Sequence, residues 1–497
     1  MDSVRTVRGQ DEERKGRTTF SVSIRKKDRE SRLTKRRFRA IGRSDEAIAA
    51  GGEKMVVPTT LAGIEAAVEL VRSRVVEEVS KGFAQLRSAL ALPEPPLFIA
   101  TTYPDILRKA VQFLDPSYAE DTRHEAVWFL TNVTSGQSEH VQAVCQAGAI
   151  PSLLDLIRDA SISLGDHAVW CLANVAGDTV EYRDMLLTAG VIPLLVAFIA
   201  REGQIDSTIR TAVWCLSNIT RGRPPVPYEL VRSLIVPVCD LLKNTQSEDI
   251  MLECVWTLQH VTALDRKDNQ QLIDIMATGV VPRLKEVCVC SDAVAARAAL
   301  RTIGTLTLGD ESLVDALVEL HTFDMLGHVI TTAHSVLVRK EALWALSNLV
   351  VGKLSHKKAF FEAGLGPVAI KMLECTHRDT VQEAVFVVSN CLLAGPSFVA
   401  DEFLSIQAIP ALVTSLRTLT VGNQQSVEDA IVMALDAVIA LLERGEGMGQ
   451  DDNPVALEVE RCGGLDLIEA MQESPLHDIY LKTNLIIDSF FMDDLLS

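Results

Sequence analysis

Apolar residues dominate a series of short stretches in this 497-residue chain, and their spacing is typical of helices buried on most sides. Each stretch carries one Trp, and in four of them an Asn follows the Trp by four positions. Positions i and i+4 share one helix face, so each pair predicts a Trp and an Asn on the same edge. The stretches read AVWFLTNVTSG (126–136), HAVWCLANVAGD (167–178), AVWCLSNITRG (212–222), ECVWTLQHVTA (253–263) and EALWALSNLVVG (341–352).

These stretches recur at a nearly constant interval. Intervals of 42, 44 and 42 residues separate Trp128, Trp170, Trp214 and Trp256. After one unit centred on Arg301, the series continues with Trp344 and Phe386, which are 42 residues apart. A helical pattern with this period is typical of the stacked two- or three-helix repeats of HEAT and armadillo proteins.

A second motif runs in phase with the first. A Gly that ends one helix is followed by a Pro in the first turn of the next, which indicates a short turn between two helices. Each repeat therefore reads as a short helix, a Gly-Pro turn, a second helix, a polar loop and a third, Trp-bearing helix. Copies or variants of the motif are QAGAIPSLLDLI (146–157), TAGVIPLLVAFI (188–199), ATGVVPRLKEV (277–287), EAGLGPVAIKML (362–373) and QAIPALVTSL (407–416).

The repeats predict an all-α protein built as a right-handed armadillo-repeat solenoid. We expect about ten repeats over residues 61–497, with atypical terminal ones, preceded by a flexible basic arm (1–43) and a linker (44–60). No apolar stretch approaches the roughly 20 residues that a membrane-spanning helix needs. We therefore expect a protein without a membrane segment.

In such a solenoid the third helices line up along the concave side, so one Trp and one Asn per repeat predict two parallel ladders. Ala168, Leu172 and Val175 would face neighbouring repeats instead. Helices pack about 8 to 10 Å apart and an extended peptide advances about 3.4 Å per residue, so successive rungs match two or three ligand residues. Slots between indoles suit the aliphatic stems of Lys and Arg, and an Asn amide can bind a peptide backbone.

One Trp in an apolar helix most often belongs to the core, and one interior Asn could be a local accident. Four copies change this interpretation, because four amides facing an apolar core would be buried without hydrogen-bond partners. The pattern therefore favours a concave binding surface.

Charge is distributed unevenly along the chain. Residues 1–43 hold 15 Lys and Arg against 6 Asp and Glu, a net charge of +9, whereas the rest holds 33 against 60, a net charge of −27. An acidic body should attract cationic segments and repel nucleic acid. Most of the ten Cys lie in apolar helical stretches and no CxxC occurs, which favours a reducing cytosolic or nuclear compartment.

The basic arm contains KGRTTFSVSIRKKDRESRLTKRRFRAIG (15–42), of which residues 21–37 can form a basic amphipathic helix. One interpretation is a solvated tail that binds nucleic acid or membrane. The other is that the arm competes for the acidic groove of its own chain, since Lys35, Arg36 and Arg37 form the kind of short basic run found in nuclear localisation signals.

With the arm and the Trp/Asn ladder in one chain, the sequence resembles the importin-α (karyopherin-α) family, the adaptors that carry proteins with basic localisation signals into the nucleus. The resemblance runs from about Arg17 to about Met492 and includes a terminal repeat at 462–491. It implies cargo with Lys/Arg-rich signals, importin-β and an export receptor as partners, with shuttling between cytoplasm and nucleus. From the residues themselves we expect no cofactor, no metal site and no catalytic residue.

The resemblance also implies which residues bind. The predicted major groove comprises Trp128, Asn132, Gly136, Trp170, Asn174, Asp178, Trp214 and Asn218, with Asp178 pairing with the principal lysine of the signal. The predicted minor groove comprises Arg301, Glu341, Trp344, Asn348, Glu383, Phe386 and Asn390. The segment that binds importin-β, or the chain's own groove, comprises Arg25, Lys26, Lys27, Arg29, Arg32, Lys35, Arg36 and Arg37.

Three positions depart from the family pattern. Thr305 stands where Asn is usual, Phe386 where Trp is usual, and His167 where Gln is usual. Phe has a weaker quadrupole than Trp and Thr lacks a two-sided amide, so we expect a weaker minor groove.

Two rival interpretations stay open at this stage. An armadillo scaffold for adhesion or signalling would share the body but would not need the basic arm. An enzyme is disfavoured, because GEGMGQ (445–450) is the only Gly-rich run and His140, His167 and His260 lack the spacing of a triad or a metal site.

Overall fold

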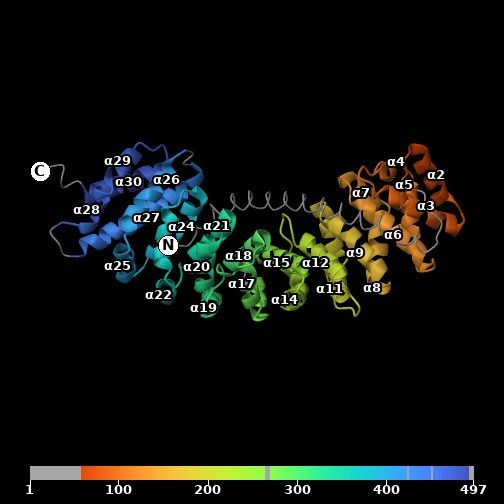
Figure 1. The fold of residues 1–497 in the computed structure, drawn as a ribbon, viewed down its shortest axis with the longest axis horizontal. Helices are drawn as coiled ribbons and strands as arrows, with labels where there is room; N and C mark the ends of the chain where they lie inside the picture. Colours follow the sequence, from red (N-terminus) through yellow and green to blue (C-terminus); the bar gives the residue numbers. More distant parts are fainter. Residues whose placement is uncertain (1–56, 264–268, 394, 423–424, 449–451, 492–497) are drawn as a thin grey trace. The chain divides into compact units, whose positions relative to one another are not determined.

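A computed structural model describes residues 57–491, except for 264–268, 394, 423–424 and 449–451. Every regular element in these ranges is a helix (Figure 1). The chain divides into two compact units, 1–265 and 266–497. The predicted arm (1–43) and most of the predicted linker lie outside the described residues.

The first unit is a stack of three-helix repeats (Figure 1). Its first repeat has two described helices, α2 (Leu61–Arg72) and α3 (Val76–Ala89). The later repeats end on the third helices α6, α9, α12 and α15. Their helices are α4 (Ile99–Thr102), α5 (Pro104–Gln112) and α6 (Glu120–Thr134); α7 (Ser138–Gln146), α8 (Ala149–Asp159) and α9 (Ile162–Ala176); α10 (Val180–Thr188), α11 (Val191–Ile199) and α12 (Asp206–Ile219); and α13 (Tyr228–Val231), η1 (Arg232–Leu234), α14 (Ile235–Asn244) and α15 (Glu248–Thr262).

The second unit continues the same pattern, with third helices α18, α21, α24, α27 and α30. Its helices are α16 (Gln270–Ala277), α17 (Val281–Cys288) and α18 (Ala293–Leu306); α19 (Glu311–Glu319), α20 (Thr322–Thr332) and α21 (Val336–Leu349); α22 (Leu354–Glu362), α23 (Leu365–Leu373) and α24 (Arg378–Leu392); α25 (Ser397–Ser405), α26 (Ala408–Thr420), η2 (Gln425–Val427) and α27 (Glu428–Glu446); and α28 (Pro454–Arg461), α29 (Gly464–Met471) and α30 (His477–Phe490).

The turn between the first two helices of a repeat requires a left-handed backbone. Gly148 and Gly190 adopt φ angles of 82° and 76° directly before α8 and α11, a region that favours glycine. At the same point before α26 the chain carries Gln407, which adopts a φ of 62°. The turn is therefore kept even where the glycine is missing.

Neighbouring third helices pack against each other within each unit: α6 on α9, α9 on α12 and α12 on α15 in the first, and α18 on α21, α21 on α24 and α24 on α27 in the second. Ala168, Leu172 and Val175 on α9 are fully buried, and so is every other residue of 168–175 except Trp170. All ten cysteines are free thiols. Burial raises the pKa of Cys171 to about 12, so this thiol stays protonated at neutral pH.

No single helix in the described ranges is long and apolar enough to cross a membrane. Two pairs of consecutive helices, α10–α11 and α25–α26, have sufficient length and apolar composition only when the two members are taken together, and each pair is sharply bent.

Basic side chains cap the carboxyl ends of helices in adjacent repeats. The clearest case is Lys357 on α22, which is 3% exposed and donates from Nζ to the carbonyls of Asn390, Cys391 and Leu393, at 3.1, 2.6 and 3.1 Å. These groups lie at the end of α24, where helix carbonyls lack partners and a positive charge is favoured. Burial lowers the pKa of Lys357 below its ordinary value.

We expect Lys357→Met to lower the free energy of unfolding by about 1 to 3 kcal/mol, because three buried carbonyls lose a charged donor. Lys358→Met is the matched control, since the neighbouring Lys358 is exposed, and its effect should stay within about 0.5 kcal/mol. Urea unfolding followed by far-UV circular dichroism measures both. Equal effects of the two substitutions would contradict the capping role.

Candidate functional site

The indoles of the first unit border solvent. Trp128, Trp170, Trp214 and Trp256 project from α6, α9, α12 and α15, and all four are half-buried although the residues on either side of each are buried. An indole in this position is held by the helix beneath it and keeps part of its ring accessible. The third helices of one unit thus carry a row of partly exposed aromatic rings.

The amides that follow these indoles are less accessible than the sequence predicts. Asn132, Asn174 and Asn218 are only 6%, 0% and 5% exposed. Asn132 Nδ2 donates to the Arg87 carbonyl at 3.1 Å and Asn218 Nδ2 donates to the Ala173 carbonyl at 3.0 Å. Each amide therefore ties its own third helix to the preceding one.

Asn174 differs from its two neighbours. Its Nδ2 donates to Thr134 Oγ1 at 3.2 Å, whereas its Oδ1 has no hydrogen-bond partner among the described residues. The premise that a buried amide here would lack every partner is thus wrong, because the preceding helix supplies an acceptor in each case. Of these three amides, only the carbonyl oxygen of Asn174 is buried without a hydrogen-bond partner in the described residues.

A hydrogen bond from the Asn position to a carbonyl of the preceding third helix recurs in both units, although the residue at that position is not always Asn. His260 takes the Asn position on α15, with Nδ1 3.1 Å from the Ser217 carbonyl. In the second unit, Asn348 Nδ2 donates to the Gly304 carbonyl at 3.4 Å and Asn390 Nδ2 to the Ser347 carbonyl at 3.0 Å. Asn348 and Asn390 are half-buried, and so are more accessible than their counterparts in the first unit.

The first slot of the ladder contains side chains of the chain itself. His167 on α9 stacks on Trp128, with ring centroids 4.8 Å apart and an interplanar angle of 27°. Its ring is also nearly parallel to that of Trp170, at 11° and 6.4 Å. Arg87 on α3 places its guanidinium carbon 4.0 Å from the centroid of Trp128 and pairs with Glu125 at 2.5 Å.

His124 completes this group from α6. Its ring meets those of Trp128 and His167 edge to face, at 5.4 and 4.8 Å. Burial lowers the pKa of His124, and nearby Arg87 adds to that shift, while the charge of Glu125 opposes it. Neither Arg87 nor His124 was identified from the sequence, because both come from outside the WxxxN pattern.

Asp178 lies directly after α9 and is half-buried. Its Oδ2 accepts a hydrogen bond from Ser138 Oγ at 2.7 Å, across the interface between two repeats. Gly136 lies near Ser138 at the end of α6, and a Cβ there would approach Nδ1 of the buried His140 to 2.7 Å. Glycine at this position is therefore explained by packing.

The predicted minor-groove residues are gathered on α18, α21 and α24 of the second unit. Glu341 is 2% exposed, with its carboxylate 3.3 Å from Arg297 Nη2 and 3.7 Å from Arg301 Nε. Glu383 is also buried, whereas Phe386 is half-buried. Two arginines of α18 therefore already compensate the charge of Glu341.

The indole of Trp344 closely approaches α18 at Gly304, a residue that the sequence did not single out. A Cβ on Gly304 would come within 2.3 Å of the indole Cζ3, so the ring requires glycine there. Thr305 donates to the Arg301 carbonyl of its own helix and makes no hydrogen bond to a neighbouring third helix in the described residues.

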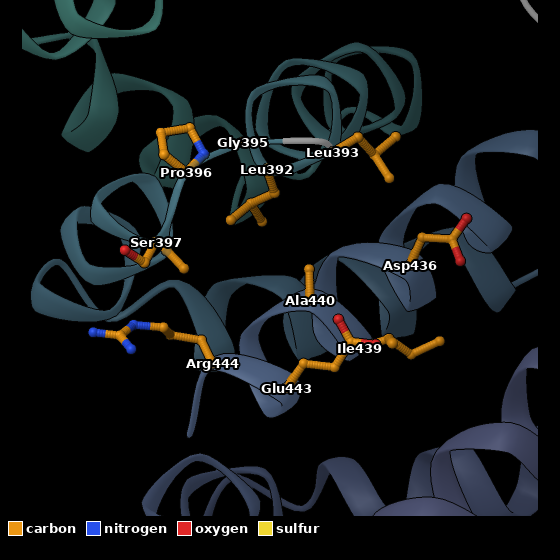
Figure 2. A pocket seen from close by; sticks show the side chains of 11 residues that line it. Leu392, Leu393, Gly395, Pro396, Ser397, Asp436, Ile439, Ala440, Glu443 and Arg444 are labelled. Carbon is orange, nitrogen blue, oxygen red and sulfur yellow. The ribbon is translucent and has the colours of Figure 1, made fainter. Parts of the chain in front are cut away.

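A separate hollow of about 470 Å³ lies between the end of α24, the start of α25 and α27 (Figure 2). Leu392 and Leu393 at the end of α24 and Glu443 and Arg444 of α27 are among the residues that line it, and Arg444 pairs with Asp401 at 2.6 Å. It contains none of the predicted groove residues. In the described part of the chain, no group of three or more His, Cys, Asp and Glu is placed to hold a metal ion.

Comparison with known families and proteins agrees with this architecture. Residues 5–82 match the importin beta binding domain, 137–177 and 179–221 match the armadillo/beta-catenin-like repeat, and 453–495 match the atypical Arm repeat. The first match continues beyond residue 43, the predicted end of the arm, into α2 and α3.

Full-length relatives are found as well. The chain is 28% identical over 491 residues to importin subunit alpha-4 of Arabidopsis thaliana, covering 97% of this chain and 90% of the relative. It is 34% identical over 301 residues to importin subunit alpha-B of Dictyostelium discoideum, covering 60% and 57%. Among solved structures, an engineered protein matches with a TM-score of 0.72 and 20% identity over 86% of this chain and 98% of that one, a likeness of fold alone.

Stacked three-helix repeats preceded by an importin-β-binding segment define the class: an armadillo-repeat protein of the transport machinery. The chain belongs to the importin-α family. Its relatives and its importin-β-binding segment support a role as an adaptor in nuclear import.

Proposed function

We propose that the row of half-buried indoles in the first unit, together with Asp178, binds the Lys/Arg-rich localisation signal of a cargo protein. The observation that carries this proposal is the placement of Trp128, Trp170 and Trp214 on adjacent third helices, with the half-buried carboxylate of Asp178 just after the end of α9. Indole faces attract the stems and charges of basic side chains, and a carboxylate selects the cation. Asp178 pairs with the principal lysine.

The asparagines contribute to this site through the amide donors and acceptors that remain after they have bonded to the preceding helix. A carboxamide nitrogen carries two hydrogens, and in Asn132 and Asn218 the bond to the preceding helix uses one of them. The unpartnered Oδ1 of Asn174 is an acceptor that a backbone N–H of the bound peptide would satisfy once the surrounding side chains shift.

The second unit binds a second basic cluster of the ligand, with a lower affinity than the major site has for the first. Arg301, Glu341, Trp344, Asn348, Glu383, Phe386 and Asn390 supply this minor site. Arg297 and Arg301 already pair with Glu341, and Phe386 offers a smaller quadrupole than Trp. A bipartite signal therefore gains less affinity here than two equal sites would provide.

The basic arm controls access to the major site. Its importin-β-binding residues are Arg25, Lys26, Lys27, Arg29, Arg32, Lys35, Arg36 and Arg37. Without importin-β, Lys35, Arg36 and Arg37 occupy the groove of their own chain, and importin-β releases it by taking the arm. The adaptor shuttles between cytoplasm and nucleus, and an export receptor returns it.

Capture on immobilised importin-β tests this function. We expect the full chain to be retained, and a chain lacking residues 1–43 to be lost from the resin while it still binds a Lys-rich peptide in solution. Peptide binding without importin-β capture of the full chain would favour an armadillo scaffold that serves adhesion or signalling. Binding of neither ligand would overturn the proposal.

A further inference from the structure

The first aromatic slot of the ladder is filled by the chain itself. The His167 imidazole lies between the Trp128 and Trp170 indoles and is close to parallel with both, at 27° and 11°. A basic side chain that enters this slot must therefore displace an imidazole that already stacks on aromatic rings.

A second side chain, that of Arg87, also covers the Trp128 ring. Arg87 projects from α3 and His167 from α9, and both of these helices pack on α6, which carries Trp128. The guanidinium of Arg87 is 4.0 Å from the ring centroid, well within the roughly 6 Å of a cation–π contact. Arg87 occupies the place on the indole that a basic ligand would use.

Arg87 is held there by a second contact. Its ion pair with Glu125 has a length of 2.5 Å, and the two side chains are only 9% and 21% exposed. Removing a guanidinium from a partly desolvated ion pair leaves the carboxylate unpaired, which is costly. Arg87 is thus a fixed occupant and not a mobile surface side chain.

We propose that Trp128 is closed to cationic ligands by His167 and Arg87, and that His167 determines which ligand positions the major site reads. Basic side chains of the ligand then bind in the slot between Trp170 and Trp214 and at Asp178. The ligand side chain that faces Trp128 contributes little to the affinity. This inference rests on the proposed peptide-binding function and specifies its selectivity.

The test compares full chains that differ at one histidine. His167→Ala empties the slot, whereas His167→Phe keeps it filled with an aromatic ring of similar size. His334→Ala is the matched control, because His334 is exposed in the loop between α20 and α21. The probe is a fluorescent Lys-rich peptide flanked by neutral residues, together with derivatives in which each lysine in turn is alanine. Circular dichroism confirms that all chains are folded.

We expect His167→Ala to bind the peptide about fivefold more tightly than the unchanged chain, because one more indole slot accepts a basic side chain. His167→Phe and His334→Ala should bind like the unchanged chain. For one peptide position, replacing lysine with alanine should weaken binding to the unchanged chain by less than about twofold. The same replacement should weaken binding to the His167→Ala variant by about fivefold.

Equal or weaker binding by His167→Ala, while the peptide still binds, would overturn closure of the slot and leave the proposed function intact. A gain in His167→Phe equal to that in His167→Ala would also overturn it. Failure of every chain to bind the peptide would overturn the proposed function together with this inference.

Discussion

Replacing Lys35, Arg36 and Arg37 with alanine in the full chain should tighten binding of a Lys-rich peptide by about 100-fold. A tethered arm reaches an effective concentration of about 1 mM. If the arm binds the groove with a dissociation constant of about 10 μM, competition weakens an external ligand about 100-fold, or by about 2.7 kcal/mol. Fluorescence anisotropy of a labelled peptide, with and without importin-β, measures the effect.

A second triple substitution separates competition from general charge. Arg14, Lys15 and Arg17 lie in the same arm but outside the 35–37 run, and their replacement with alanine removes the same number of cations. Little change is expected from it. Importin-β should tighten peptide binding to the unchanged chain and should have no further effect on the Lys35/Arg36/Arg37 variant. An unchanged affinity in that variant would discard autoinhibition by this segment.

Asp178→Lys should weaken peptide binding by at least about 30-fold. The substitution removes the carboxylate that pairs with the principal lysine and puts a like charge in its place, and loss of a partly buried charge partner typically costs about 2 to 5 kcal/mol. Ser138 would lose its acceptor, a cost to stability of about 1 kcal/mol that leaves the repeats folded. Isothermal titration with the same peptide gives the affinity.

Asp155→Lys is the control for this charge reversal. Asp155 is exposed on α8, the second helix of its repeat, whereas the indoles of the ladder lie on third helices. Its substitution changes the net charge of the body equally and should alter affinity by less than about threefold through long-range attraction. Comparable losses in both variants would show that Asp178 acts through net charge alone, and peptide binding retained by Asp178→Lys would show that the groove is misassigned.

Much of the candidate site follows from the sequence because its residues recur. The period of the Trp residues and the glycine turns predict three-helix repeats, and the structure has them, including the turn at Gln407 where glycine is missing. The i, i+4 rule places each Trp on the same helix edge as the residue four positions later. The half-buried state of the indoles agrees with an edge that borders solvent.

The environment of those residues does not follow from the repeats. Asn218 donates to Ala173, 45 residues earlier, and Arg87 reaches Trp128 from another helix. Gly304 underlies Trp344 for the same reason, since a close contact between two helices depends on how they are aligned. Nothing local marks these partners, so the buried amides and the filled slot could not be predicted.

By itself, then, the sequence determined the class of fold, the family and the helix edge on which each indole and amide lies. Those properties depend on periodicity, turn residues and charge distribution, which are local and recur several times along the chain. Only the tertiary structure decided which indole faces are accessible, which amides are already engaged and which carboxylates are already paired. Those properties depend on the register between packed helices, where shifts of a few ångströms exchange one hydrogen-bond or stacking partner for another.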